Sequence, residues 1–134
     1  IVSLIEGKDE TNLNINSYAG LGSRKPLLAA LLSVVMFSLA GIPPFAGFFG
    51  KYYIFIAAIK ANLTWLAILG VISSAISIYF YLRIVVLMYF KSSENEIVIE
   101  DSRNSMLAII FSVLVIILLG IFPGTLIDLI TRFI

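Results

Sequence analysis

The sequence predicts an all-α polytopic membrane protein, a helix bundle with three transmembrane segments of which the first is broken at residues 41–44. Apolar residues make up 60% of the chain and charged residues 13%, against about 25% charged residues in an average soluble domain. The mean hydropathy is +1.08. So little polar surface could not cover the chain in water. The apolar residues form three runs, each long enough to cross a bilayer.

Residues 1–25 precede the first predicted span. The chain does not begin with Met, and its apolar start, residues 1–5, is typical of the end of a preceding helix. We therefore expect a C-terminal piece of a longer protein. Residues 6–25 are polar and predict a cytoplasmic loop. Pro26 suits the start of the next helix. Backbone N–H groups in the first turn have no intrahelical partner, so the N–H that proline lacks is not missed there.

The segment 26–60 should be a discontinuous transmembrane helix. A straight helix over residues 27–59 would be about 50 Å long, against roughly 30 Å of hydrocarbon. Pro43 and Pro44 lack backbone donors, and Pro43 disfavours helical geometry at Ile42. We therefore expect half-helices at about 27–40 and 44–60. Irregular backbone exposed to lipid is not viable, so the joint must be buried in protein or line a wet cavity.

Two more spans follow the broken one. A polar turn at 60–62 leads to a transmembrane helix at 63–90, and residues 91–104 form a polar, acidic cytoplasmic loop. The last span, 105–122, should stop at Pro123 and Gly124. The tail 123–134 is amphipathic and should lie along the interface on the outer side of the membrane.

Loop charge predicts the orientation of the bundle. Cytoplasmic segments carry an excess of Lys and Arg. One side of this bundle would hold six cations, Lys8, Arg24, Lys25, Arg83, Lys91 and Arg103, and the other side only two, Lys60 and Arg132. The first side is therefore expected in the cytoplasm, and the C-terminus on the outer side.

The composition excludes several classes of function. The chain has no cysteine and no histidine, so it lacks the side chains that hold iron–sulfur clusters, haem or ordinary zinc sites. We expect no cofactor and no metal in this chain, and no catalysis by a Cys–His or Ser–His–Asp arrangement. A net charge of +1 also argues against a nucleic-acid partner.

Lys51 is the first candidate functional residue. It is the only charged residue between Leu27 and Ile59, and a charge at membrane depth costs roughly 2.5–3.5 kcal/mol on insertion scales. In a polar cavity, desolvation would favour its neutral form, so that the amine could take up and release protons. The alternative is a lysine whose head reaches back to the interface. Lys60 fits that alternative better, since Lys51 lies about 13 Å deeper along a helix.

The helix break and three polar residues are further candidates. Gly41, Pro43 and Pro44 could form a hinge that exposes carbonyls and helix ends to an ion, as in transporters, or only a kink in a tilted helix. The hydroxyls of Ser73 and Ser77 share one helical face and could extend a proton path, although small residues also serve helix packing. Arg83 is either an electrostatic partner of that path or a topology anchor.

Three sequence runs resemble a known family. They are SLAGIPPFAGFFGKYY at 38–53, YFYLR at 79–83 and LGIFP at 119–123. Together they are similar to the antiporter-like membrane subunits of respiratory complex I, and most similar to the subunit N branch. Subunit L shares the lysine but continues into a long lateral helix, and the tyrosines after Lys51 also fit subunit N better.

The resemblance implies a role for the chain. Those subunits are built from two inverted repeats, of which this chain would hold the last three helices. A discontinuous helix among them carries a lysine, or in one paralogue a glutamate, on the proton route to the outer side, and that role maps onto Lys51. The other groups of the proton path lie on earlier helices, so this piece alone should not pump.

The expected function is proton translocation within NADH-quinone oxidoreductase, coupled to quinone reduction elsewhere in the complex. The chain would then be part of a translocase without redox chemistry of its own, in the cell inner (plasma) membrane. Its partners would be the other membrane subunits and the lipid bilayer. Two alternatives stay open: a subunit of a multi-subunit cation/proton antiporter, and a membrane anchor with no ion path.

Overall fold

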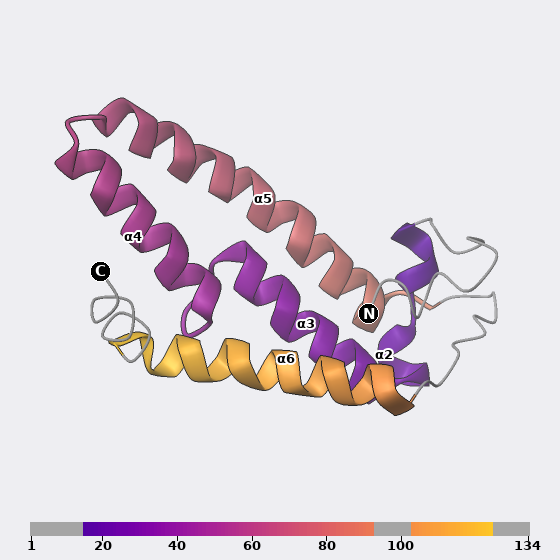
Figure 1. Cartoon of the computed structure of the whole chain (residues 1–134). Helices are drawn as coiled ribbons and strands as arrows, with labels where there is room; N and C mark the ends of the chain where they lie inside the picture. Colours follow the sequence, from indigo (N-terminus) through magenta and orange to yellow (C-terminus); the bar gives the residue numbers. More distant parts are fainter. Residues whose placement is uncertain (1–14, 93–102, 125–134) are drawn as a thin grey trace.

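The structure, a computed structural model, describes residues 15–92 and 103–124. Within them lie a 3-10 helix and five α-helices and no strand (Figure 1): η1 Ile15–Tyr18, α2 Leu21–Arg24, α3 Pro26–Ala40, α4 Ala46–Lys60, α5 Thr64–Phe90 and α6 Arg103–Ile121. The predicted all-α class is confirmed. The expected helix end at residues 1–5 and the amphipathic tail from residue 125 onward lie outside the described residues.

The polar segment before Pro26 differs from the predicted loop, because its second half is helical. Gly20, with a φ of 71°, joins η1 to α2, and its N–H donates to the carbonyl of Leu87 at 3.3 Å. That carbonyl belongs to the last turn of α5, where helix carbonyls have no intrahelical partner. Leu21 is buried beside it. The helical turns η1 and α2 therefore satisfy a free carbonyl at the end of α5 and bury the side chain of Leu21.

The broken helix is observed as α3 and α4. Gly41 ends α3 in the left-handed region, with a φ of 81°. Its N–H donates to the carbonyl of Ser38 at 3.0 Å, and the N–H of Ile42 donates to that of Phe37 at 3.1 Å. This pair of bonds is the Schellman arrangement that closes helices at glycine. Residues 41–45 then leave the helical path, and α4 begins at Ala46, two residues later than the sequence suggested.

The two half-helices overlap at their ends rather than meeting end to end. The backbone of Gly47 lies against Ser38, and the side chain of Lys51 lies against Gly41. Figure 1 shows the loop leaving the end of α3 and returning beside it before α4 begins. Because the numbering rises in the same direction on both sides of the contact, the overlapping turns run parallel.

The long helix α5 lies against both half-helices, and α6 packs on their opposite side (Figure 1). With 27 residues, α5 is about 40 Å long. The turn before it closes at Asn62, which has a φ of 60°, a conformation that Asn tolerates better than most residues. Helices α5 and α6 are each long and apolar enough to cross a membrane, and α3 is a shorter apolar helix.

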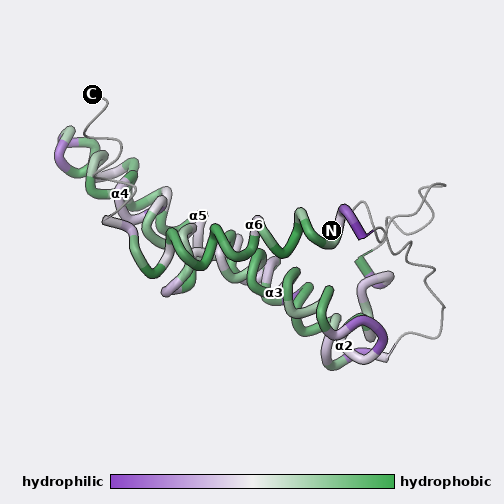
Figure 2. The backbone as a smooth tube through the Cα atoms, turned by 60° about the horizontal axis from the view of Figure 1, so that its bottom comes forward, coloured by the Kyte–Doolittle hydropathy of each residue, from purple (hydrophilic) through white to green (hydrophobic). Residues whose placement is uncertain are grey.

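Few apolar side chains of the described residues are buried, and many large ones are exposed. The buried core is a small cluster where α2, α3 and α5 meet: Leu21, Leu28, Ala29, Leu32 and Met88. On α5 only 6% of the most apolar window is buried, and Figure 2 shows hydrophobic residues along the lengths of the helices. A bundle with such an exterior needs lipid or further protein around it.

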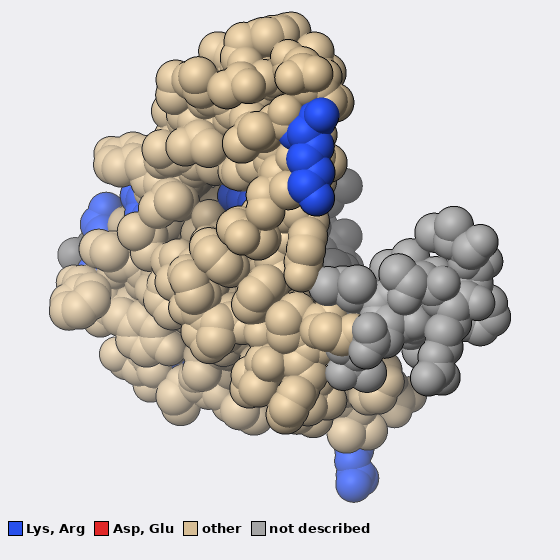
Figure 3. Space-filling view, turned by 90° about the vertical axis from the view of Figure 1, so that its left-hand side faces the viewer, with Lys and Arg blue, Asp and Glu red and all other residues tan. Residues whose placement is uncertain are grey.

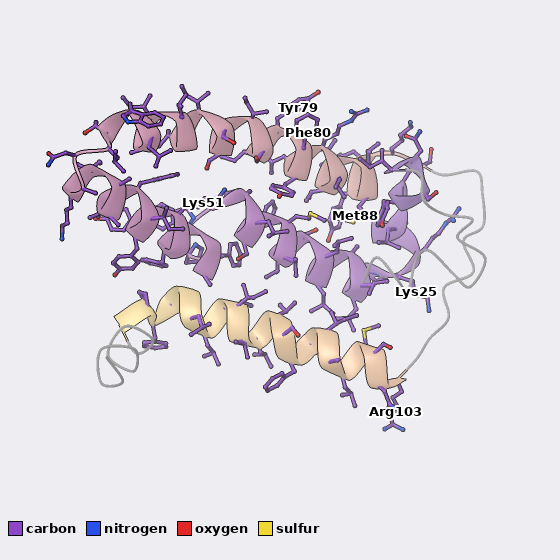
Figure 4. All side chains as sticks on the ribbon, turned by 45° about the horizontal axis from the view of Figure 1, so that its top comes forward. Lys25, Lys51, Tyr79, Phe80, Met88 and Arg103 are labelled. Carbon is purple, nitrogen blue, oxygen red and sulfur yellow. The ribbon has the colours of Figure 1, made fainter. Side chains whose placement is uncertain are left out.

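Cations gather toward the ends of the bundle. Lys25 and Arg103 lie at one end, and Lys51 lies far from them, near the break (Figure 4). The face shown in Figure 3 carries few cations on a largely uncharged surface. No Asp or Glu falls within residues 15–92 and 103–124. Lys51 therefore has no carboxylate partner in the part of the chain that the structure describes.

Candidate functional site

Lys51 lies in the second turn of α4 and reaches back to the end of α3. Its Nζ donates a hydrogen bond to the carbonyl oxygen of Ala40 at 3.2 Å, and the side chain is half-buried. In Figure 4 it points into the space between the half-helices and α5. The amine of Lys51 is thus held between helices, whereas Lys60 is exposed at the end of α4.

The carbonyl of Ala40 is a suitable acceptor because the helix ends there. The last carbonyls of an α-helix have no intrahelical donor, and the closing bonds at Gly41 and Ile42 use the carbonyls of Phe37 and Ser38 instead. The carboxyl end of a helix also carries partial negative charge, which favours a nearby cation. The break therefore creates, inside an apolar bundle, a position that attracts an ammonium group.

Gly41 makes room for the lysine. A Cβ at this position would lie 3.0 Å from Cδ of Lys51 and 3.4 Å from its Nζ. The absence of a side chain therefore lets the stem of Lys51 cross the end of α3. The same glycine supplies the positive φ that ends the helix.

A second hydrogen bond also runs from α4 to α3, this time from a backbone donor to a side-chain acceptor. The N–H of Gly47 donates to Oγ of Ser38 at 3.2 Å. Phe45, the residue before α4, gives no side-chain cap, so a buried serine from α3 satisfies one of the open donors at the start of α4. Sequence reasoning missed Ser38, because nothing in the spacing reveals that residues 38 and 47 lie side by side.

A cavity of about 250 Å³ adjoins Lys51. One wall is formed by Ala40 at the end of α3, by Gly41 after it, and by a mostly aromatic set from α4. The other wall is a face of α5 that includes Ser74 and Ala75. The polar side chains on its wall are those of Lys51, Tyr52 and Ser74. The cavity lies between α3, α4 and α5, and most of its lining residues are apolar. The expectation of a wet space beside the break stays a prediction.

The structure does not bring Ser73, Ser77 and Arg83 to this cavity. Its α5 lining is Val71, Ser74, Ala75 and Ile78, the three-and-four spacing of one helical face. Ser73 and Ser77 fall outside that face, and Oγ of Ser77 donates to the carbonyl of Ser73 at 2.9 Å. Arg83 is exposed on α5. The roles suggested for these three residues stay predictions.

The irregular backbone after Gly41 meets α6 at its C-terminal end, at Pro44 and Phe45. Gly120 is buried, and a Cβ there would overlap the carbonyl oxygen of Pro44 and the backbone of Phe45. Pro43 and Pro44 themselves are exposed. One side of the break thus meets α6 at a glycine, while its other end, Ala40 and Gly41, lines the cavity.

Comparison with known proteins places the chain in a family. The family described as NADH:quinone oxidoreductase/Mrp antiporter, TM, matches residues 1–77. NADH-quinone oxidoreductase subunit N of Trichlorobacter lovleyi is 53% identical over 96 residues, 72% of this chain and 20% of that protein. Subunit N 1 of Chloroherpeton thalassium is 44% identical over 128 residues, 96% of this chain and 26% of that protein.

A solved structure shares the fold. A chain of respiratory complex I from Thermus thermophilus, with bound aureothin, superposes with a TM-score of 0.76 at 29% identity, over 90% of this chain and 30% of that chain. The present chain thus spans about a quarter of the length of the curated relatives. The family match includes the run at 38–53 and confirms the resemblance that this run suggested. The chain therefore belongs to the NADH:quinone oxidoreductase/Mrp antiporter transmembrane family.

Proposed function

We propose that this chain is part of subunit N of a proton-translocating NADH-quinone oxidoreductase and that it carries a proton-transfer lysine, Lys51. The observation that carries the proposal is the position of Lys51. A lone amine lies inside an apolar bundle, on the open carbonyl of a broken helix and beside a cavity. The similarity to subunit N proteins supports the assignment to that complex.

In the proposed mechanism, Lys51 holds a proton as an ammonium group at the end of α3. There its Nζ donates a hydrogen bond to the carbonyl of Ala40, and the partial negative charge at the helix end attracts the ammonium group. When the proton leaves, the amine loses its charge and with it most of this attraction. The side chain can then turn toward the cavity wall on α5, where space is available. Proton occupancy and side-chain position are thereby linked.

Within the complex, the chain would act together with other parts of the same subunit and with other subunits. Protons would reach Lys51 from groups on other parts of the full subunit, and the energy would come from quinone reduction elsewhere in the complex. The partners are other membrane subunits and lipid, and the chain crosses the cell inner (plasma) membrane several times. It binds no redox cofactor itself, a proposal supported by the lack of cysteine and histidine in its sequence.

The test replaces the lysine in the full-length subunit within the assembled complex. In membrane vesicles, Lys51→Ala should strongly reduce NADH-driven proton uptake, because the carrier is lost. Lys60→Ala is the matched control on the same helix and should leave proton uptake near the wild-type level, because Lys60 is exposed at the helix end. Unchanged uptake in both Lys51→Ala and Lys51→Met would favour a membrane anchor without an ion path.

A cation/proton antiporter is the second candidate, favoured by the family description, which includes Mrp antiporters. Lys51 would then carry the proton that is exchanged for a cation. The two candidates separate in cells that carry Lys51→Ala. Loss of sodium tolerance with intact NADH-linked pumping would support the antiporter and overturn the complex I assignment.

A further inference from the structure

Two hydrogen bonds link the half-helices reciprocally. The start of α4 is capped by the hydroxyl of Ser38 from α3, and the end of α3 is capped by the amine of Lys51 from α4. Each half-helix therefore satisfies an open backbone group of the other. Ser38, which accepts the first of these bonds, has no role in the proton transfer proposed above.

Ser38 differs from the other helical serines with assigned hydrogen bonds. The hydroxyls of Ser33, Ser77 and Ser112 each donate to the carbonyl four residues earlier in their own helix, at 2.8–2.9 Å, which is the usual local bond of a serine in a helix. Oγ of Ser38 instead accepts a hydrogen bond from α4. It is buried, with 7% of its surface exposed.

The contact at Gly47 sets the position of Lys51. Gly47 and Lys51 are four residues apart in α4 and so lie on the same face, one turn from each other. A Cβ at Gly47 would overlap the carbonyl of Ser38, so the two helices touch there at backbone distance. If this contact shifted along or around the helix, the face of α4 that carries Lys51 would turn away from Ala40.

We propose that Ser38 is a positioning residue for the proton-carrying lysine. Its hydroxyl holds the first turn of α4 against α3, in the register that places Nζ of Lys51 on the carbonyl of Ala40. This inference rests on the function proposed for Lys51. Ser38 is then the residue of α3 that positions Lys51, and the overlap of the two half-helices is what brings Lys51 to the carbonyl of Ala40.

The experiment uses the full-length subunit in the assembled complex, with Ser33 as the matched control. Ser33 lies on the same helix and is equally exposed at 7%, but its hydroxyl bonds only within α3. Ser38→Ala should lower NADH-driven proton uptake roughly fivefold, the effect of losing a helix cap of ordinary strength. Ser33→Ala should stay near the wild type, and Ser38→Thr, which keeps the hydroxyl, should recover most of the uptake.

Hydrogen exchange of the purified complexes gives a readout independent of transport. Peptides that cover residues 45–50 should exchange faster in Ser38→Ala, and not in Ser33→Ala. Equal uptake and equal exchange in the two alanine variants would overturn the positioning role, even where Lys51→Ala abolishes uptake. Faster exchange in Ser38→Ala with uptake intact in Lys51→Ala would overturn instead the function proposed for the lysine.

A cysteine pair keeps the test decisive if Ser38→Ala does not assemble. Ser38→Cys keeps the shape of the side chain with a somewhat larger atom and leaves only a weak acceptor, and Ser33→Cys, which adds the same atom, is its control. Lower uptake together with faster exchange at residues 45–50 in Ser38→Cys alone supports the proposal. Equal proton uptake and equal exchange at residues 45–50 in the two cysteine variants would overturn the positioning role of Ser38.

Discussion

Lys51 was identifiable from sequence because a lone charge in a long apolar run is costly, whatever the fold. Its hydrogen-bond partner was not. The acceptor is a backbone carbonyl, which every residue carries, and Ala40 provides it only because α3 ends there and α4 starts alongside. Ser38 and Ser74 were missed for a related reason. Which serine faces another helix depends on how the helices are rotated and overlapped, and the residue types alone do not fix that rotation.

At the residue scale, Gly41 provides the sharpest prediction. Gly41→Ala places a Cβ in the left-handed region, which costs roughly 1–2 kcal/mol, and brings it 3.0 Å from Cδ of Lys51. The lysine side chain should be pushed off the carbonyl of Ala40. We expect a several-fold loss of NADH-driven proton uptake in vesicles that contain the assembled complex.

Gly50→Ala is the control for this substitution. Gly50 lies one residue before Lys51 within α4, and a Cβ there meets no atom within 4 Å. Alanine also favours a helix more than glycine does, so this variant should retain uptake. Equal uptake in the two variants would show that neither the positive φ nor the space at Gly41 matters to the lysine.

At the element scale, the length of the apolar run indicated that it could not be one straight, upright helix, because such a helix would exceed the bilayer thickness. The two prolines and the glycine then placed the break within a few residues. Irregular backbone within a membrane also needs protein or water beside it, but the neighbouring element could not be identified from sequence. That element is α6, whose Gly120 meets Pro44 and Phe45, and a glycine near the end of an apolar helix gives no signal of its partner.

Gly120→Ala tests this contact. The new methyl group would overlap the carbonyl of Pro44. Because the obstacle is backbone, α6 or the break must move, at a cost typical of overpacking, about 1–3 kcal/mol. We expect the complex to lose NADH-driven proton uptake at a lower temperature than the wild type after brief heating. Gly124→Ala, where a Cβ meets nothing within 4 Å, should match the wild type, and equal heat resistance of the two variants would contradict the packing role of Gly120.

At the scale of the whole molecule, composition predicted the fold class, and the structure explains why it was sufficient. With little of α5 buried, the bundle exposes apolar side chains such as Trp65 at 60% and Phe90 at 85%, which only lipid or neighbouring protein can cover. The helical turns at residues 15–24 were not predicted. They depend on an unoccupied carbonyl at the end of α5, a contact between segments far apart in the sequence.

The orientation of the bundle is the remaining prediction at this scale. Asn62 and Lys91 flank α5 and are both exposed, about 40 Å apart along the helix. The chain has no cysteine, so a single cysteine at either position is a unique label within it. By the distribution of Lys and Arg, a membrane-impermeant maleimide should modify Asn62→Cys in spheroplasts and Lys91→Cys only in inverted vesicles. Labelling of both from one side would mean that α5 does not cross the membrane, and the reverse pattern would place Asn62 in the cytoplasm and overturn the predicted orientation.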